Sequence, residues 1–241
     1  MHDLKKTPVG DIVKEYPSAA KVFAQYQIDF CCGGEKPLEQ ACEKKQVDPE
    51  KLVEEVKSQN SASAATTPRF DRWNPRFLAD YIEENHHSFV RNNIPVILKW
   101  SRKVATVHGQ WKPENVEISQ VFDELSRAMY DHLEKEEKEA FPLIREMQQA
   151  AEKGDQEGLQ KAEQKFEKVL HEMKDEHEEA GHQMSKIQEL SNNFTPPQEA
   201  CNTYKALYNA LHDFQEDLHQ HVHLENNILF PKAEELKSYQ K

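Results

Sequence analysis

The chain has 241 residues, and its 31 basic against 43 acidic residues give a formal net charge of −12. No local basic patch reverses this charge, so we expect neither nucleic acid nor an anionic membrane surface as a partner. No apolar run approaches the roughly 20 residues of a membrane-spanning helix, and the N-terminus lacks the apolar stretch of a signal peptide. We therefore expect a soluble, cytoplasmic protein with one substantial core and room for a small second unit.

Short helices are predicted near the N-terminus. They open at Thr7-Pro8, Pro17-Ser18 and Asp48-Pro49, where a capping residue or a proline suits the first helical turn. The polar run from residue 58 to residue 68 has no periodicity and predicts a linker. We expect a small helical, cysteine-bearing domain at residues 1–58, a linker at 59–73 and a larger domain at 74–241.

Cys31 and Cys32 stand next to each other in "DFCCGG". Disulfide geometry is strained across one peptide bond, so the two thiols are not expected to pair. The glycines that follow leave the backbone free to expose both sulfurs, which suits metal binding, persulfide transfer or thiol exchange with a partner. The alternative is a buried pair of small apolar side chains at a helix end. The isolated Cys42 and Cys201 are interpreted as structural.

Four long amphipathic helices are predicted after the linker. The first begins at Asn74-Pro75 and ends near Gly109, the second covers roughly residues 116–149 and the third roughly 156–190. The fourth is expected to begin at Thr195-Pro196 and to end near residue 236. Only 7 glycines occur and no alternating strand-like stretch is present, so the fold class is all-α. Short connections between long helices favour an antiparallel four-helix bundle.

Histidine and glutamate occupy inward positions in this predicted bundle. Apolar stripes with steps of three and four residues pass through His132 and Glu136 in the second helix, His177 in the third, and His221 and Glu225 in the fourth. The first helix is ambiguous. His86 continues a stripe from Leu78 and Ile82, whereas His87 leads into a stripe that continues through Val90, Ile94 and Ile97.

An ionised glutamate left alone in an apolar interior costs several kcal/mol, so a positive group must compensate it. Lysine and arginine are absent from these stripes, and histidine four residues before glutamate is a ligand pairing that divalent metals use in helical bundles. Two metals bridged by Glu136 and Glu225 would neutralise both acids. Nitrogen and oxygen ligands favour iron or manganese, and zinc is also compatible.

The alternative is structural. Some of these histidines could be core residues that hydrogen-bond to the glutamates, or the helices could be rotated so that the pairs face water. The Phe-Pro that follows each His–Glu pair is interpreted as packing at the end of a helix. Five histidines that fall off the stripes are expected to face solvent, and these are His171, His182, His212, His219 and His223.

The segments "DFCCGG", "ENHHSFVRNNIP", "HLEKEEKEAFP", "KDEHEEAGH" and "HLENNILFP" together resemble the RIC family (repair of iron centres). Members join a small ScdA-type domain to a hemerythrin-like di-iron bundle, and the resemblance covers nearly the whole chain. It selects His87, eight residues before Pro95, as the first-helix ligand. The implied ligands of two iron ions are His87, His132, Glu136, His177, His221 and Glu225, a set that leaves open coordination positions.

The resemblance implies repair of iron-sulfur clusters after oxidative or nitrosative damage, with iron-sulfur proteins as clients. The leading hypothesis is an iron donor in which Cys31 and Cys32 dock the protein to its client. A second hypothesis is a di-iron enzyme that reduces nitric oxide to nitrous oxide. A third is a hemerythrin-like sensor of oxygen or nitric oxide. Whether such a protein acts as a monomer or a homodimer is open in the sequence.

Overall fold

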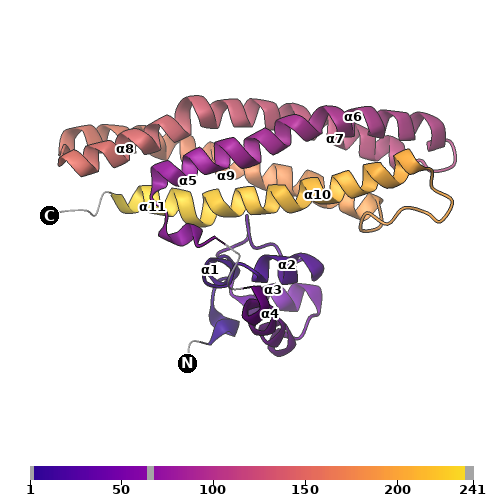
Figure 1. Ribbon diagram of the computed structural model, residues 1–241, viewed down its shortest axis with the longest axis horizontal. Helices are drawn as coiled ribbons and strands as arrows, with labels where there is room; N and C mark the ends of the chain where they lie inside the picture. Colours follow the sequence, from indigo (N-terminus) through magenta and orange to yellow (C-terminus); the bar gives the residue numbers. More distant parts are fainter. Residues whose placement is uncertain (1–2, 64–67, 237–241) are drawn as a thin grey trace.

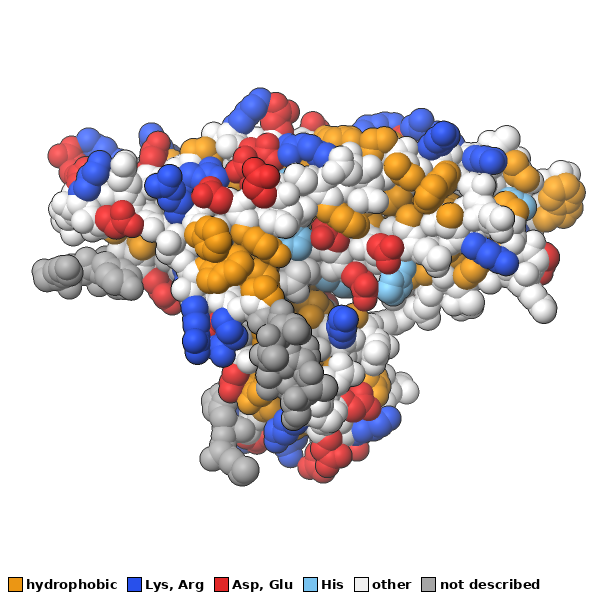
Figure 2. Space-filling view, viewed as in Figure 1, with side chains coloured by type: hydrophobic (Ala, Val, Ile, Leu, Met, Phe, Trp, Pro, Cys, Tyr) orange, Lys and Arg blue, Asp and Glu red, His pale blue; other side chains and the backbone are white. Residues whose placement is uncertain are grey.

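The computed structural model describes residues 3–63 and 68–236. Within these ranges the regular secondary structure is helical, and the one isolated β-bridge joins Pro8 to Pro37. The all-α prediction is therefore confirmed. No helix in the described part of the chain is long and apolar enough to cross a membrane. On the face shown in Figure 2, basic and acidic side chains are interspersed over the bundle, and no extended basic patch is visible there.

A small helical unit forms the N-terminal part of the structure (Figure 1). It contains α1 (Val9–Glu15), α2 (Ala19–Gln25), α3 (Leu38–Lys45) and α4 (Pro49–Ser63). Its buried core includes Val9, Ile12, Phe23, Leu38 and Leu52. The sequence did not predict α3, which begins after Pro37 without a side-chain cap and therefore lacks the usual N-terminal signal.

The expected linker is wrong at both ends. Helix α4 continues to Ser63, because residues 58–63 contain no glycine or proline to stop it. Toward the other end, Phe70–Arg72 forms a 3-10 turn, and Phe70 packs into the apolar core of the bundle. Residues 64–67 of the expected linker lie outside the described residues.

The four long helices of the bundle are present, and three are interrupted by π-turns. The first comprises α5 (Pro75–Ile82), a π-turn (Glu83–His87) and α6 (Ser88–His108). The second comprises α7 (Glu114–Lys135), a π-turn (Glu136–Ala140) and α8 (Phe141–Lys153). The third is the continuous α9 (Gln156–Leu190). The fourth comprises α10 (Asn202–Leu224), a π-turn (Glu225–Leu229) and α11 (Phe230–Glu235). These helices lie side by side along the long axis of the molecule (Figure 1).

The predicted start of the fourth helix is wrong, because α10 begins at Asn202. Asn192, Asn193 and Phe194 have φ near +50°, which turns the chain out of α9 in the left-handed region. Pro196 is followed by another proline, and a residue before proline is disfavoured in the helical region. The chain therefore crosses from the third to the fourth helix in a longer connection.

The apolar interior of the bundle is divided into two clusters. One contains Ile94, Phe122 and Phe214, and the other contains Phe141, Phe166 and Phe230. The π-turns lie in the sequence between the α-helical segments that supply these two clusters. The buried polar side chains of the next section come from this middle layer.

Candidate metal centre

The structure brings together the six side chains that the sequence analysis and the resemblance selected as ligands. Their ligand atoms form two groups in which all atoms lie within 4.8 Å of one another. Both groups contain Glu136 and Glu225, the first residues of two π-turns. One group adds His87 and His221, and the other adds His132 and His177. A pair of carboxylates shared by two histidine pairs is the arrangement expected for two cations bridged by glutamate.

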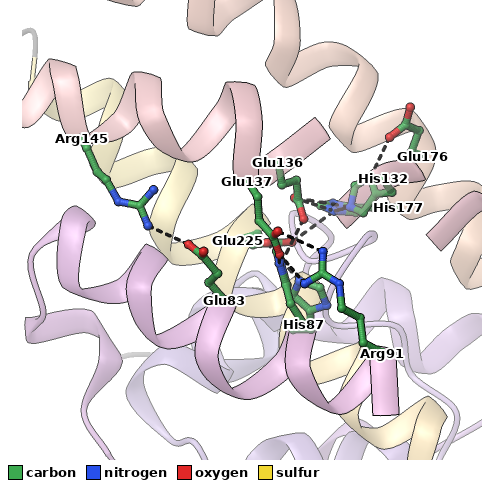
Figure 3. A network of polar contacts seen from close by, with 11 residues as sticks. Glu83, His87, Arg91, His132, Glu136, Glu137, Arg145, Glu176, His177 and Glu225 are labelled. Carbon is green, nitrogen blue, oxygen red and sulfur yellow. Dashed lines mark hydrogen bonds and ion pairs between the residues drawn. The ribbon is translucent and has the colours of Figure 1, made fainter. Parts of the chain in front are cut away.

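Distances around Glu136 show how closely the side chains converge (Figure 3). Its Oε2 is 3.3 Å from His87 Nε2, and its Oε1 is 3.4 Å from His132 Nε2 and 3.7 Å from His177 Nε2. Glu225 lies between the third and fourth helices, with Oε2 3.2 Å from His177 Nε2 and Oε1 3.1 Å from His221 Nε2. The facing imidazole nitrogens therefore point at the carboxylates from all four bundle helices.

The residues fit a bound metal because the site has buried polar atoms without protein partners. Glu136 and Glu225 are 0% exposed, yet both oxygens of Glu136 and Oε2 of Glu225 lack a hydrogen-bond partner. His87 Nε2 is also without one. Buried polar atoms in native proteins are normally satisfied, and a buried carboxylate pair needs compensating positive charge. A cation among these atoms would meet both requirements.

The pKa values of the site residues in the absence of metal indicate the same need for positive charge. Burial lowers the pKa of His132, but Glu136 and Glu176 together outweigh burial and raise that pKa to about 9. The pKa of His177 is likewise raised well above its ordinary value by Glu136 and Glu225, against the effect of burial. Burial alone would raise the pKa of Glu136, but the neighbouring histidines hold it well below its ordinary value. In the site without metal, protonated histidines therefore supply the positive charge that a divalent cation would otherwise supply.

Outer partners orient three of the four histidines. Glu137 Oε1 is 2.7 Å from His87 Nδ1 and is itself paired with Arg91. Glu176 Oε2 is 2.7 Å from His132 Nδ1 (Figure 3). The other oxygen of Glu176 accepts a hydrogen bond from Lys135 Nζ at 2.6 Å. Such partners fix the tautomer and the ring orientation of a ligating histidine.

The third orienting partner is Asn226, whose Oδ1 is 3.1 Å from His177 Nδ1. In contrast, His221 Nδ1 has no hydrogen-bond partner. The sequence analysis did not identify Glu137, Glu176 or Asn226. The available signal was their position, because each directly follows or precedes a candidate ligand in the chain.

His86 and His87 are both buried, which explains the ambiguity in the sequence. The π-turn Glu83–His87 adds one residue to the helix, so the stripe that ends at His86 and the stripe that starts at His87 both face inward. His87 belongs to a metal group, whereas His86 Nδ1 pairs with Asp217 Oδ1 at 2.9 Å. The His86 ring also stacks on His221, with centroids 5.6 Å apart.

The interpretation of Phe-Pro as packing at a helix end is wrong. Phe141 and Phe230 each begin the α-helical segment after a π-turn, and the helix continues through the proline. Phe141 stacks on the His87 ring, and Phe230 lies parallel to the His177 ring with centroids 6.3 Å apart. The aromatic side chains therefore form part of the apolar wall around the centre.

The thiol loop, defined as Asp29–Gly34, lies against the helices that carry the centre. Cys32 Sγ is 3.5 Å from the backbone oxygen of His177. Asp29 shapes the loop by accepting the backbone N–H groups of Cys31, Cys32 and Gly33. Cys31 is buried, and its hydrogen bond with Cys32 together with burial raises its pKa well above the ordinary value. A cavity of about 150 Å³ lies beside the two thiols and the third helix.

Two of the five histidines that were expected to face solvent are covered in the structure. His171, His182 and His212 are exposed as expected. The solvent-facing prediction is wrong for His223, which is buried, and for His219, which is partly buried. The ring of Phe30 from the N-terminal unit contacts both of these imidazoles, with centroids 5.7 and 5.8 Å away.

The two isolated cysteines also differ from each other. Cys42 is buried in the core of the N-terminal unit, in agreement with a structural role. Cys201 is exposed, which does not support its interpretation as structural. Its thiol lies 3.6 Å from His108 Nε2.

Comparisons with known proteins agree with this architecture. Residues 5–60 match ScdA_N, described as a domain of unknown function (DUF542), and residues 79–233 match the hemerythrin HHE cation binding domain. The iron-sulfur cluster repair proteins YtfE of Yersinia pseudotuberculosis serotype IB (strain PB1/+) and Yersinia pestis (strain Pestoides F) are each 32% identical over 239 residues. Each of these alignments covers 96% of this chain and 98% of the relative. The chain therefore belongs to the RIC family of iron-sulfur cluster repair proteins, with an ScdA_N domain followed by a hemerythrin-like domain.

Proposed function

We propose that this protein repairs damaged iron-sulfur clusters by holding two iron ions between its four bundle helices and donating iron to client proteins. The observation that carries the proposal is the pair of fully buried glutamates shared by two histidine pairs. Relatives that align over nearly the whole chain are named for cluster repair, which supports iron-sulfur proteins as the clients. In this account His87, His132, His177 and His221 are terminal ligands, and Glu136 and Glu225 bridge the two ions.

The donor set suits iron that is to be released. Imidazole and carboxylate hold iron less selectively than thiolate, which is the preferred ligand of iron in clusters. Iron can therefore pass from this centre to the cysteine ligands of a client. The rings of Phe141 and Phe230 cover the His87 and His177 imidazoles, and Glu137, Glu176 and Asn226 orient three of the four imidazoles.

Cys31 and Cys32 are proposed to mediate the contact with the client. Their loop lies on the third helix beside His177, so a client thiol that reached it would be close to the proposed iron. Neither nitric oxide reduction nor gas sensing is favoured by the comparisons, because the relatives are named for cluster repair.

The test compares the iron-loaded protein with a Cys31→Ser, Cys32→Ser double variant. Each is mixed anaerobically with a hydratase whose iron-sulfur cluster has been damaged, and the recovered hydratase activity is measured. We expect the native protein to restore activity, and the double variant to keep its iron but lose this ability. Cys201→Ser is the matched control, because it removes an exposed thiol outside the thiol loop.

Two results would contradict the proposal. Equal recovery of hydratase activity with the double variant would show that the two thiols are not needed for repair. Recovery by a His132→Ala variant that contains no iron would show that the donated iron does not come from this centre.

A further inference from the structure

The π-turn Glu225–Leu229 carries three consecutive polar side chains with different contacts. The Glu225 carboxylate lies 3.2 Å from His177 Nε2 inside the candidate metal centre. Asn226 Oδ1 lies 3.1 Å from Nδ1 of the same imidazole. Asn227 contacts the N-terminal unit instead, and its Nδ2 donates to two backbone carbonyls of the thiol loop at 3.2 Å each. One turn of helix therefore connects the metal centre with the thiol loop.

The Asn227 side chain is fitted closely into the N-terminal unit. Its acceptors in the N-terminal unit are the backbone oxygens of Phe30 and Cys31, and its Nδ2 also lies 3.2 Å from His223 Nδ1 on the preceding turn of its own helix. Its Oδ1 lies where a Cβ on Gly10 or on Gly34 would approach to 2.5 Å. A methyl group at that distance cannot be accommodated without movement, so glycine at both positions is what allows the amide to enter. This fit is specific to the docked arrangement of the two units.

The thiol loop also contacts α9, the third helix of the bundle. Cys32 Sγ lies 3.5 Å from the backbone oxygen of His177. The loop thus contacts the backbone of the candidate ligand His177. It also contacts the side chain of Asn227, which lies two residues after the candidate ligand Glu225. In this arrangement Cys31 is 5% exposed and Cys32 is partly buried. Reaction of both thiols with a partner requires the loop to move away from the bundle.

We propose that Asn227 is a positioning residue that couples the occupancy of the metal centre to the accessibility of Cys31 and Cys32. With metal bound, Glu225 is held at the centre and Asn227 keeps the thiol loop docked. Without metal, Glu225 is held by contacts to His177 and His221 at 3.2 and 3.1 Å and not by coordination to a cation, so the turn that carries Asn227 is less well held. Because docking and metal binding share this turn, each stabilises the other.

The inference rests on the proposed metal site but not on the proposed repair of clients. It predicts that the loop thiols are covered in most iron-loaded molecules and exposed in more of the metal-free ones, so that a client reaches them in the minor undocked population of the loaded protein. A client protein is not needed to test it. A failure here is therefore distinguishable from a failure of the repair hypothesis.

The experiment measures alkylation by iodoacetamide, with anaerobic protein that is either metal-free or loaded with two equivalents of Fe(II). Labelling of each cysteine peptide is followed over time by mass spectrometry. Cys201 is exposed and serves as the internal reference for reagent reactivity, whereas the fully buried Cys42 reports unfolding of the N-terminal unit. We expect the native thiol loop to react about tenfold or more slowly when iron is loaded, relative to Cys201.

Asn227→Ala should remove this difference. Loss of two hydrogen bonds increases the undocked population about 30-fold, so the loop thiols should react rapidly with or without iron. Bound iron should stay at the native level, because Asn227 is not a member of either metal group. Gln27→Ala is the matched control, since it removes another hydrogen bond between the two units, from Gln27 Nε2 to Asn193 Oδ1 at 2.6 Å. It should retain the iron-dependent protection.

Two results would overturn the inference. One is a native protein whose loop thiols react equally fast with and without iron. The other is iron-dependent protection that persists in Asn227→Ala, which would show that Asn227 does not couple the metal centre to the thiols. If Asn227→Ala unfolds the N-terminal unit, Cys42 will also react, and a second pair of variants then decides.

That second pair consists of Gly34→Ala and Gly181→Ala. A Cβ at Gly34 would lie 2.5 Å from Asn227 Oδ1, whereas a Cβ at Gly181 would lie 3.7 Å from Cys32 Sγ, an ordinary contact. In iron-loaded protein, Gly34→Ala should accelerate alkylation of the loop thiols and Gly181→Ala should not. Equal rates in the two variants would also overturn the inference.

Discussion

At the scale of single residues, Glu136 and Glu225 define the centre. Each is completely buried, and each lies within about one hydrogen-bond length of histidines from different helices. A single buried His–Glu pair would suit a structural role. Here both glutamates belong to two groups of candidate ligands, each with its own pair of histidines. Three of the four carboxylate oxygens have no hydrogen-bond donor in the protein. This arrangement favours two cations bridged by the glutamates.

The outer partner Glu137 provides a prediction at this scale. Glu137→Ala removes the carboxylate that orients His87 through Nδ1. We expect the affinity for Fe(II) to fall about 10- to 100-fold, while saturating iron still fills the site, because the six ligands remain. The measurement is an anaerobic titration against a competing chelator. Glu134→Ala is the control, since Glu134 is exposed and pairs only with Lys138 on the same helix. An unchanged affinity in Glu137→Ala would show that this carboxylate does not orient a ligand.

At the scale of elements, the π-turns decide which side chains reach the centre. Each adds one residue to a helical turn, so the inward face shifts by one position as the helix passes the centre. In the second helix Ala140 is fully buried, and a constant step of three would bury Leu143 next; Leu143 is only partly buried, whereas Phe141, Ile144 and Met147 are fully buried. Regular spacing could identify His132, Glu136, His221 and Glu225, which precede or open a π-turn. It could not show the shift, because a constant period contains no signal for an inserted residue.

Deletion of Glu139 tests the role of a π-turn. Glu139 is exposed within Glu136–Ala140, so its removal can close the turn to a regular α-helix and leave the faces of α7 and α8 unchanged. We expect thermal unfolding to show a stability loss of about 2 kcal/mol or less, together with loss of most bound iron. Glu139→Ala keeps the π-turn and should keep the iron. Native iron content in the deletion variant would show that the turn is not needed to place Glu136.

At the scale of the whole molecule, the contacts between the two units are what the sequence could not predict. The inward stripes of the four long helices depend on neighbours within a few turns and were confirmed, whereas the start of the fourth helix and the end of α4 were not. The contact of Phe30 with His219 and His223, and the contact of Cys32 with His177, join residues far apart in the chain. Local periodicity therefore placed two covered histidines in solvent. The same long-range packing places the cysteines beside the candidate centre.

Metal content per chain tests the central claim most directly. Protein purified without added metal, beside His132→Ala and Glu225→Ala variants, is analysed for iron, manganese and zinc. The account predicts about two irons per chain in the native protein, as in other di-iron bundles, and loss of iron in both variants. Absence of iron, or zinc at a single site, would contradict a di-iron centre and leave the buried His–Glu cluster as a structural or differently metallated one.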